Sequence, residues 1–167
     1  MEWYSNAHNL AFVIGRGDVW KGAGLIAAYS PLTPWWRNVE LAVDSAFTGK
    51  ARTDTLGNSA RIAQLILDGS DPREAIRGDK TRSFCENIAL NGYSNNATID
   101  VHAFSIAHGK PIPSSQITMG KRLYREIADS YSRAAKREGI MTTQMQAITW
   151  VVWRDRYPKK AAQNRSS

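Results

Sequence analysis

Residues 75–104, AIRGDKTRSFCENIALNGYSNNATIDVHAF, decide the fold class. Gly78 interrupts the chain and is followed over 79–90 by apolar residues at helical spacing. A turn-rich loop over 92–97 comes next, and Asp100 then stands where the N-cap of another helix is expected. The stretch therefore predicts a helix, a loop and a second helix, with a short polar motif at the start of each helix.

The same helical periodicity extends over most of the chain. Apolar residues recur every three or four positions, and no stretch alternates convincingly with period two. The expected fold class is therefore all-α, with about nine helices in a single compact domain over 1–157 and a basic C-terminal tail over 158–167. The expected helices cover residues 3–14, 19–29, 34–46, 60–67, 72–76, 79–90, 101–108, 116–138 and 142–156, with Asp18, Thr33, Asp71 (or Ser70) and Asp100 as caps.

Two helices carry more specific expectations. Gly22 and Gly24 lower helix propensity in the second helix, so we expect them to permit close packing against a neighbour. The last helix is expected to bury one apolar side. That side comprises Met145, Ile148, Thr149, Val152 and Trp153.

Charge and composition indicate the class of partner. The 167 residues carry a net charge of +7 with a pI near 9.8, which favours an anionic partner, with nucleic acid as the leading candidate. Part of the excess lies near the C-terminus, where it is either a solvated end or a nucleic-acid contact. These cations are Arg154, Arg156, Lys159, Lys160 and Arg165.

The scarcity of metal-binding residue types limits the possible chemistry. Cys85 is the only cysteine, which excludes a disulfide within the chain, a cysteine-built zinc site and a four-cysteine iron–sulfur cluster. His8, His102 and His108 lack metal-ligand spacing, so we expect neither metal nor cofactor. The sequence has no apolar run of eighteen residues and no signal-peptide pattern, so we expect a cytoplasmic protein that does not contact membranes. We also expect it to be a monomer.

Two motifs carry a resemblance to a known superfamily. Gly78-Asp79-Lys80-Thr81 resembles the Gly-x-Lys-Thr end of the hairpin in helix-hairpin-helix DNA glycosylases. Twenty residues later, Thr98-Ile99-Asp100-Val101-His102 is similar to the Val-Asp-x-His segment that carries the catalytic aspartate of that superfamily. The continuation over residues 103–107 resembles the 8-oxoguanine branch of the superfamily. Residues 25–38 resemble the helix, loop and helix that open its fold, and residues 144–150 resemble its closing helix.

The resemblance spans residues 24–155 and indicates a small phage-type member of the 8-oxoguanine and endonuclease III-like group that lacks the iron–sulfur cluster. It therefore implies a bacterium or a phage-infected cell as the source. It also shows departures. The family hairpin usually contains Leu-Pro-Gly-Val-Gly before the lysine, where this chain has Ala75-Ile76-Arg77-Gly78-Asp79. The shorter loop weakens the expected backbone grip on phosphate, which Arg77 and Arg82 would supply with their side chains instead.

The resemblance implies a DNA base glycosylase with Schiff-base lyase activity, acting on a flipped base in double-stranded DNA. Asp100 would stabilise the positive charge that develops on the sugar, and a helix N-terminus favours its anionic form. Lys80 would attack the sugar as a neutral amine, a form that partial burial would favour. Alternatively, Asp100 is an ordinary N-cap, and Lys80 is a surface lysine that touches phosphate.

Further residues are candidates for DNA or base binding. Leu32 would either insert into the gap left by the extruded base or be a buried loop leucine. Trp36, next to Trp35, is expected to be exposed and suited to base stacking. Phe84 and His102 are also explained by a place in the core. The full set of candidates is Ser30, Leu32, Trp36, Asn38, Arg77, Gly78, Arg82, Phe84, His102 and Gln144.

Two other functions remain open. The first is a phage base-hypermodification enzyme of the same fold, which would displace pyrophosphate from an activated pyrimidine with an amine. The altered hairpin favours this alternative, because such an enzyme needs less grip on DNA. The second is a non-catalytic DNA-binding or inhibitory protein, which has no need for Lys80 and Asp100 together.

Overall fold

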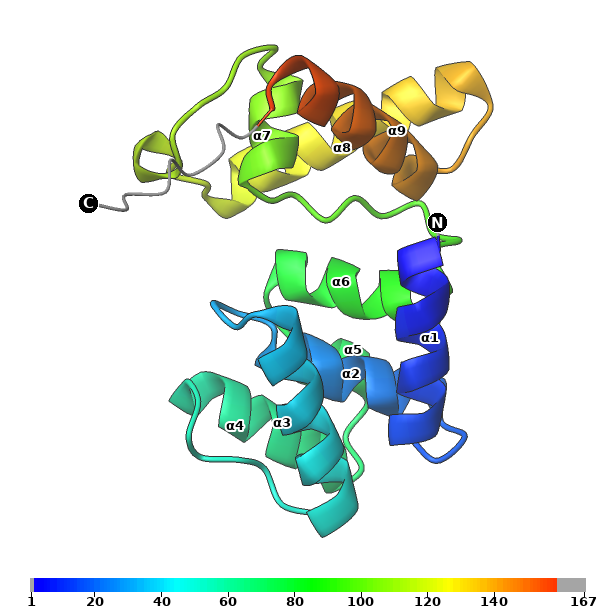
Figure 1. Cartoon of the computed structure of the whole chain (residues 1–167), viewed down its shortest axis with the longest axis vertical. Coiled ribbons are helices and arrows are strands. Elements are labelled where there is room, and N and C mark those ends of the chain that lie inside the picture. The colour runs from blue at the N-terminus through cyan, green and yellow to red at the C-terminus, as the bar shows by residue number, and fades with distance from the viewer. Residues whose placement is uncertain (1, 159–167) are drawn as a thin grey trace, which may run out of the picture.

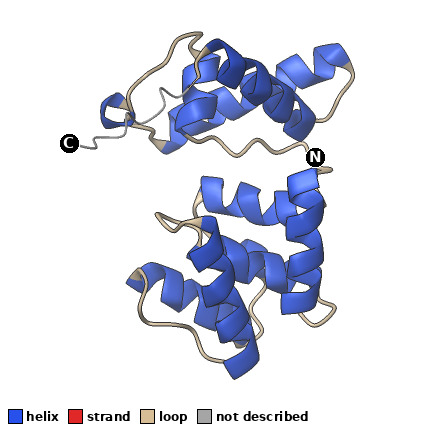
Figure 2. Cartoon of the chain, viewed as in Figure 1, coloured by secondary structure: helices blue, strands red, loops and turns tan. Residues whose placement is uncertain are grey.

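The computed structural model describes residues 2–158, and this range contains helices and no strand (Figures 1 and 2). The predicted all-α fold class is confirmed. The α-helices are α1 (Glu2–Ile14), α2 (Val19–Tyr29), α3 (Trp35–Thr48), α4 (Gly57–Leu67), α5 (Pro72–Ala75), α6 (Asp79–Ala89), α7 (Val101–Ala107), α8 (Lys121–Glu138) and α9 (Thr142–Arg156), with a short 3₁₀ turn, η1 (Ser114–Gln116), before α8.

The helices form two lobes, each with its own apolar cluster. The N-terminal lobe comprises α1 to α6, and the C-terminal lobe comprises α7 to α9 (Figure 1). The chain over residues 93–99 runs between them in an irregular, largely extended form. The structure therefore divides the expected single core into two clusters, and the boundary between the lobes lies at the two polar motifs.

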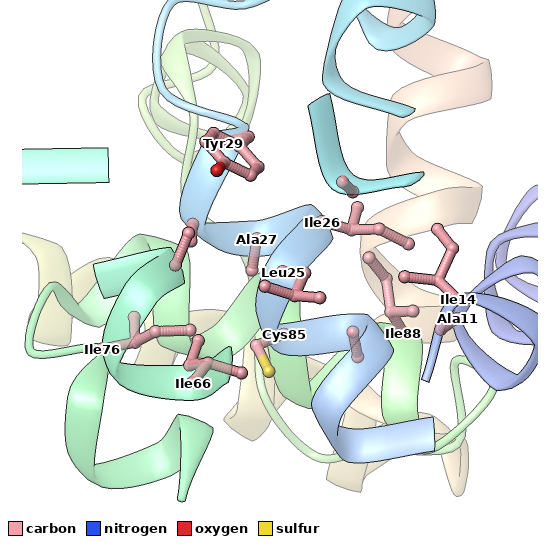
Figure 3. Packing of buried hydrophobic residues seen from close by; sticks show 14 of the residues in the cluster. Ala11, Ile14, Leu25, Ile26, Ala27, Tyr29, Ile66, Ile76, Cys85 and Ile88 are labelled. Carbon is pink, nitrogen blue, oxygen red and sulfur yellow. The ribbon is translucent and has the colours of Figure 1, made fainter. Parts of the chain in front are cut away.

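Helix α2 is the centre of the N-terminal lobe. All its residues from Gly22 to Tyr29 are buried, and α1, α3, α4 and α6 surround it (Figure 3). A Cβ atom on Gly22 would lie 1.8 Å from the carbonyl oxygen of Ala11 in α1, and one on Gly24 would lie 2.6 Å from the Cβ of Pro72. The prediction that these glycines permit close packing is confirmed.

The C-terminal lobe is built around α7 and α8. Its buried apolar side chains come from both helices and from the chain just before α7. Helix α9 contradicts the expectation of a buried apolar side, because Ile148 is 53% exposed and Val152 is 61% exposed, whereas Thr142 and Thr143 are buried. Apolar residues occur on every side of α9, and only its first turns pack deeply. The buried apolar cluster of this lobe comprises Ala97, Ile99, Ala103, Phe104, Tyr124, Ile127 and Tyr131.

Most predicted helix starts are correct. Asp18, Asp71 and Asp100 each accept a hydrogen bond from a backbone amide of the helix that they cap. Thr33 is not a cap: its hydroxyl donates to the carbonyl of Pro31, and Pro34 is the N-cap of α3. Helix α8 begins five residues later than expected, because the chain before it forms η1 and then extends through Gly120.

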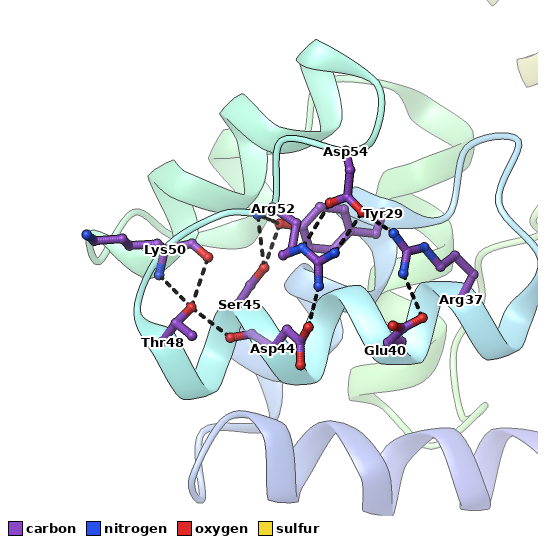
Figure 4. Close-up of polar contacts among 9 residues, drawn as sticks. All are labelled: Tyr29, Arg37, Glu40, Asp44, Ser45, Thr48, Lys50, Arg52 and Asp54. Carbon is purple, nitrogen blue, oxygen red and sulfur yellow. Dashed lines mark hydrogen bonds and ion pairs between the residues drawn. The ribbon is translucent and has the colours of Figure 1, made fainter.

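An ion-pair network holds the loop between α3 and α4 against α3 (Figure 4). Arg52 binds Asp54 through Nε and Nη2, at 2.8 and 2.7 Å, and also pairs with Asp44. Arg37 pairs with Asp54 and with Glu40. The hydrogen bond from Arg52, with a smaller contribution from Arg37, keeps the pKa of Asp54 below its ordinary value. The network fixes this loop beside the α2–α3 loop, with which it shares a surface cavity.

Of the cations predicted near the C-terminus, Arg154 and Arg156 belong to α9, which ends at Arg156 as expected. Lys159, Lys160 and Arg165 lie outside the described residues. Across residues 2–158, none of the helices combines the length and the apolar character that crossing a bilayer requires.

Candidate functional site between the lobes

Lys80 and Asp100 line the same cavity, although twenty positions separate them in the chain. The cavity, here named the Lys80–Asp100 cavity, has a volume of about 370 Å³ and lies between the lobes. Lys80 comes from the first turn of α6, and Asp100 is the N-cap of α7. Its volume is within the range of small-molecule sites. The remaining lining residues are Ser30, Pro31, Leu32, Thr81, Phe84 and Thr98.

Lys80 stands at a helix start without a side-chain cap. Gly78, the N-cap of α6, has φ −76° and ψ 124°, and no side chain accepts from the first-turn amides. The side chain of Lys80 is exposed, so the partial burial expected from the sequence is not observed. The neighbouring Asp79 faces arginines, because its Oδ1 accepts from Arg82 Nη2 at 3.1 Å and its Oδ2 lies 3.6 Å from Arg125 Nε. These arginines balance the negative charge beside Lys80.

Asp100 caps α7 and also faces the cavity. Its Oδ1 accepts the backbone amide of Ala103 at 2.8 Å, which is the ordinary N-cap hydrogen bond. This bond uses one carboxylate oxygen and leaves Oδ2 for a ligand. The N-cap interpretation and the ligand-facing interpretation are therefore compatible in this structure.

A buried asparagine of the N-terminal lobe holds the chain that leads to Asp100. Asn87 of α6 is fully buried, and its Nδ2 donates to the carbonyl of Asn96 at 3.3 Å and to Thr98 Oγ1 at 3.1 Å. Its Oδ1 accepts from the hydroxyl of Ser94. Asn87 thus connects α6, which carries Lys80, to the segment that positions Asp100.

Two side chains of the C-terminal lobe hold the same segment from the other side. The hydroxyl of Tyr124 donates to the carbonyl of Ala97 at 3.1 Å and accepts the amide of Ile99 at 3.2 Å. The amide group of Gln146 accepts from Thr98 N at 3.0 Å and donates to Thr98 O at 2.6 Å. Sequence reasoning missed these positioning roles. The signal for Asn87 was a polar residue between Cys85 and Ile88 on an apolar helix face.

Leu32 lies at the rim of the cavity in an unfavourable backbone conformation. Its side chain is 95% exposed, and its φ is +56°, a region that L-residues other than asparagine and aspartate rarely adopt. The alternative of a buried loop leucine is therefore wrong. Ser30, in the same loop, donates its hydroxyl to the carbonyl of Ala27 at 2.8 Å. Trp36 is 69% exposed, as expected.

Other predicted candidates fall into two groups. Arg77, Gly78 and His102 are exposed, so the interpretation of His102 as a core histidine is wrong. Phe84 is half-buried, lines the cavity and stacks on Trp3 with ring centroids 5.9 Å apart.

Two further candidates have partners within the protein, and a third is buried. Arg82 is bound to Asp79. Gln144 Oε1 accepts the amide of Met141 at 2.9 Å and so caps α9. Asn38 is 2% exposed, and its side chain does not reach the surface of α3, so it is not available to DNA in this conformation.

Metal-binding and thiol chemistry find little support in the described residues. Within residues 2–158, no group of three or more histidine, cysteine, aspartate and glutamate side chains is placed to hold a metal ion. Burial raises the pKa of the Cys85 thiol to about 12. Cys85 is therefore a small core residue rather than a nucleophile.

The fold and site define an all-helical, two-lobed protein with a lysine and an aspartate facing one cavity at the lobe boundary. The chain belongs to a family of unknown function, DUF7178, whose model matches residues 1–157. No curated protein and no solved structure matches the chain.

Proposed function

We propose that this protein is a DNA base glycosylase that extrudes a base from duplex DNA and cleaves its N-glycosidic bond, with Schiff-base lyase activity. The observation that carries the proposal is the shared cavity of Lys80 and Asp100. An amine and a carboxylate on opposite lobes of one sugar-sized cavity are the groups that such a reaction needs.

Asp100 acts on the sugar through its charge. Cleavage of the N-glycosidic bond develops positive charge at C1′ and the ring oxygen, and an ionised carboxylate beside them lowers the energy of that transition state. The hydrogen bond from the backbone amide of Ala103 fixes the orientation of the Asp100 carboxylate.

Lys80 acts as the nucleophile. Its neutral amine forms a bond to C1′ as the bond to the base breaks, and the nitrogen loses a proton to solvent. The nitrogen lone pair then forms the C=N bond as the bond from C1′ to the ring oxygen breaks, and that oxygen takes up a proton, which leaves the protonated Schiff base of the opened sugar. The uncapped amides in the first turn of α6 place the positive end of the helix near this side chain. Lys80 can reach the sugar because it lines the same cavity as Asp100.

Contacts to duplex DNA come from charge and from the exposed loop. Exposed cations lie at the starts of two helices, Arg77 and Lys80 at α6 and Lys121 and Arg125 at α8. The pairing of Asp79 with Arg125 brings the two helix starts together. Such cations bind phosphates without reading sequence. Leu32, exposed on a rigid loop at the cavity rim, is placed to fill the gap that an extruded base leaves.

Base release from a panel of duplexes, each with one damaged or modified base, tests the proposal. Asp100→Asn keeps the N-cap, because asparagine caps helices as well as aspartate does, but removes the charge. We expect release to fall about 100-fold or more in this variant. Lys80→Gln should abolish strand nicking, whereas Lys121→Gln, which removes a first-turn lysine of α8, should leave it unchanged apart from a modest loss of DNA affinity.

Other outcomes identify the competing functions. Duplex binding without base release or nicking on any member of the panel would support a non-catalytic DNA-binding protein. Conversion of a pyrophosphorylated pyrimidine in the presence of an amine, dependent on Asp100, would support base hypermodification. Either result would overturn the glycosylase proposal.

A further inference from the structure

Helix α3 presents a row of apolar side chains to solvent. Its buried side chains lie on one side of the helix, which packs into the N-terminal lobe. The other side carries Trp36, Val43 and Phe47, which are 69%, 42% and 81% exposed. Val43 and Phe47 follow Trp36 by about two and three helical turns, so the three side chains lie in one row. We name this row, together with Glu40 one turn after Trp36, the α3 stripe.

The area of the α3 stripe is large for an apolar surface that contacts only solvent. A fully covered aromatic side chain buries about 150–250 Å². At the observed exposures, the stripe therefore offers roughly 400 Å², which is the size of the largest apolar patch on a typical monomer. Two such stripes in contact bury roughly 800 Å², and the polar residues at their edges raise the total to the roughly 1,000 Å² that a specific interface needs. The area therefore suits a second copy of this chain.

The charges in and beside the α3 stripe are paired within the molecule (Figure 4). Glu40 accepts from Arg37 Nη1 at 2.7 Å, and Asp44 pairs with Arg52. Both arginines also share Asp54. This face therefore carries little net charge, whereas the whole chain carries +7. A second copy that approaches here meets little electrostatic repulsion, and nucleic acid meets little attraction.

The order of side chains along the α3 stripe is complementary to itself. When two copies of α3 pack antiparallel about a two-fold axis midway between positions 41 and 42, Trp36 faces Phe47 of the second copy. In the same arrangement, Glu40 faces Val43 of the second copy and keeps Arg37 as its ion-pair partner. A two-fold interface makes each contact twice. Two pairs of aromatic rings therefore close the ends of the interface, and the smaller side chains lie at its centre.

We propose that the α3 stripe is a homodimer interface, in which the α3 helices of two copies pack antiparallel. The dimer takes the place of the monomer expected from the sequence, and Trp36 contacts protein instead of stacking on a base. The residues that line the Lys80–Asp100 cavity all lie outside the stripe, so the interface does not use them. The proposal therefore does not depend on the proposed glycosylase activity.

Sedimentation equilibrium tests the interface. We expect a monomer–dimer equilibrium with a Kd of about 10 µM, which Phe47→Ser should weaken about tenfold or more. Phe12→Ser is the matched control, because Phe12 is a 54% exposed phenylalanine of α1. Phe12 follows Trp3, which contacts Trp35 of α3, by about two and a half turns, so it lies on the side of α1 away from α3. This variant should leave the Kd unchanged.

Cysteine cross-linking tests the antiparallel arrangement. In that arrangement, position 36 of one copy faces position 47 of the other, whereas the two copies of position 47 lie about 16 Å apart along the helix axis, beyond the reach of a disulfide. An oxidised mixture of Trp36→Cys and Phe47→Cys chains should therefore form a mixed disulfide, and Phe47→Cys alone should not. Cys85 does not interfere, because it is buried.

Three outcomes would overturn the proposal. The first is a wild type that stays monomeric at about 1 mM, or a dimer that Phe12→Ser weakens as much as Phe47→Ser does. The second is a disulfide that forms in Phe47→Cys alone and not in the mixture, which would contradict the antiparallel arrangement. The third is a loss of DNA affinity in Phe47→Ser without any change in the association of the chain, which would assign the α3 stripe to nucleic acid.

Discussion

The N-terminal lobe buries a whole helix, whereas the C-terminal lobe leaves much of one exposed. Other helices enclose α2. The backbone of α1 packs so closely against its Gly22 that a side chain there would clash with it. Helix α9 instead packs through its first turns and exposes Ile148 and Val152. The N-terminal lobe therefore carries Lys80 on the more deeply packed core. Asp100 is held by a smaller core and by three polar side chains, the buried Asn87 of the N-terminal lobe and Tyr124 and Gln146 of the C-terminal lobe.

The largest expected effect is the loss of close helix packing in the N-terminal lobe. In Gly22→Ala, the new Cβ would lie 1.8 Å from a backbone oxygen of α1, so the helices must separate. We expect the free energy of unfolding to fall by about 3 kcal/mol or more, measured by urea denaturation. Gly57→Ala is the control, since a Cβ there meets no atom within 4 Å, and it should change stability by less than about 1 kcal/mol. Equal effects of both variants would show that the α1–α2 contact is not tight.

Two isoleucines of the C-terminal lobe test whether α9 contributes to its core. Ile127 of α8 is 4% exposed, and Ile148 of α9 is 53% exposed. Replacement of Ile127 by alanine should lower the free energy of unfolding by about 3 kcal/mol, and replacement of Ile148 should change it by less than about 0.5 kcal/mol. Native-state hydrogen exchange should show faster exchange in α8 of the first variant. A similar loss in both variants would place Ile148 in a core that the structure does not show.

The pH dependence of stability compares buried groups of the two lobes. Burial raises the pKa of Cys85 from 9.0 to about 12 and that of Tyr131 from 10.0 to about 12. Above its unfolded-state pKa, each group loses its proton in the unfolded chain but keeps it in the folded chain, so stability falls as pH rises. Between pH 7.5 and pH 10.5, the free energy of unfolding should fall by about 2 kcal/mol less in Cys85→Ala than in the wild type. For Tyr131→Phe, this difference from the wild type should be less than about 1 kcal/mol.

Thermal and urea unfolding at both pH values measure this difference. Cys85→Ala at pH 10.5 is compared with the same variant at pH 7.5, so the stability lost with the side chain cancels in the comparison. Parallel pH profiles for the wild type and Cys85→Ala would show that the thiol is accessible to solvent in the folded state.

The smallest expected change in stability concerns the loop at the lobe boundary. Leu32→Gly removes a side chain from a residue with φ +56°. The change relieves about 1 kcal/mol of backbone strain, which is at least as much as the cost of the flexibility that glycine adds to the unfolded chain. We expect equal or slightly greater stability together with weaker base extrusion, followed by the fluorescence of 2-aminopurine in a duplex. Leu56→Gly, at a loop leucine with φ −59°, should lose stability instead. Unchanged extrusion in Leu32→Gly would argue against a role as a wedge.

Local sequence patterns predicted the helices and most caps because these depend on neighbouring residues. The residues beside Asp18, Asp71 and Asp100 identified these three aspartates as helix caps. The packing role of the two glycines in α2 was inferred from their low helix propensity. The burial of α9 was mispredicted because apolar residues surround that helix, so periodicity alone gave no single buried face. Thr33 failed as a cap because its hydroxyl bonds to Pro31 instead.

The candidate site was predicted in part. The motifs placed Lys80 and Asp100 at helix starts, and their shared cavity follows from the way the lobes meet. The roles of Asn87, Tyr124 and Gln146 depend on contacts across 9 to 48 positions, which no local pattern encodes. A second cavity that Asp100 lines is formed by Trp3 of α1 and Trp150 of α9, from opposite ends of the chain, and was not predicted.

Borohydride trapping on a duplex with an abasic site tests the convergence of Lys80 and Asp100 most directly, because it does not depend on the identity of the base. The structure predicts a covalent adduct that peptide mapping assigns to Lys80, that disappears in Lys80→Gln and that forms at least tenfold more slowly in Asp100→Asn. An adduct spread over other lysines such as Lys121, or an adduct at Lys80 that forms at the same rate in Asp100→Asn, would contradict it.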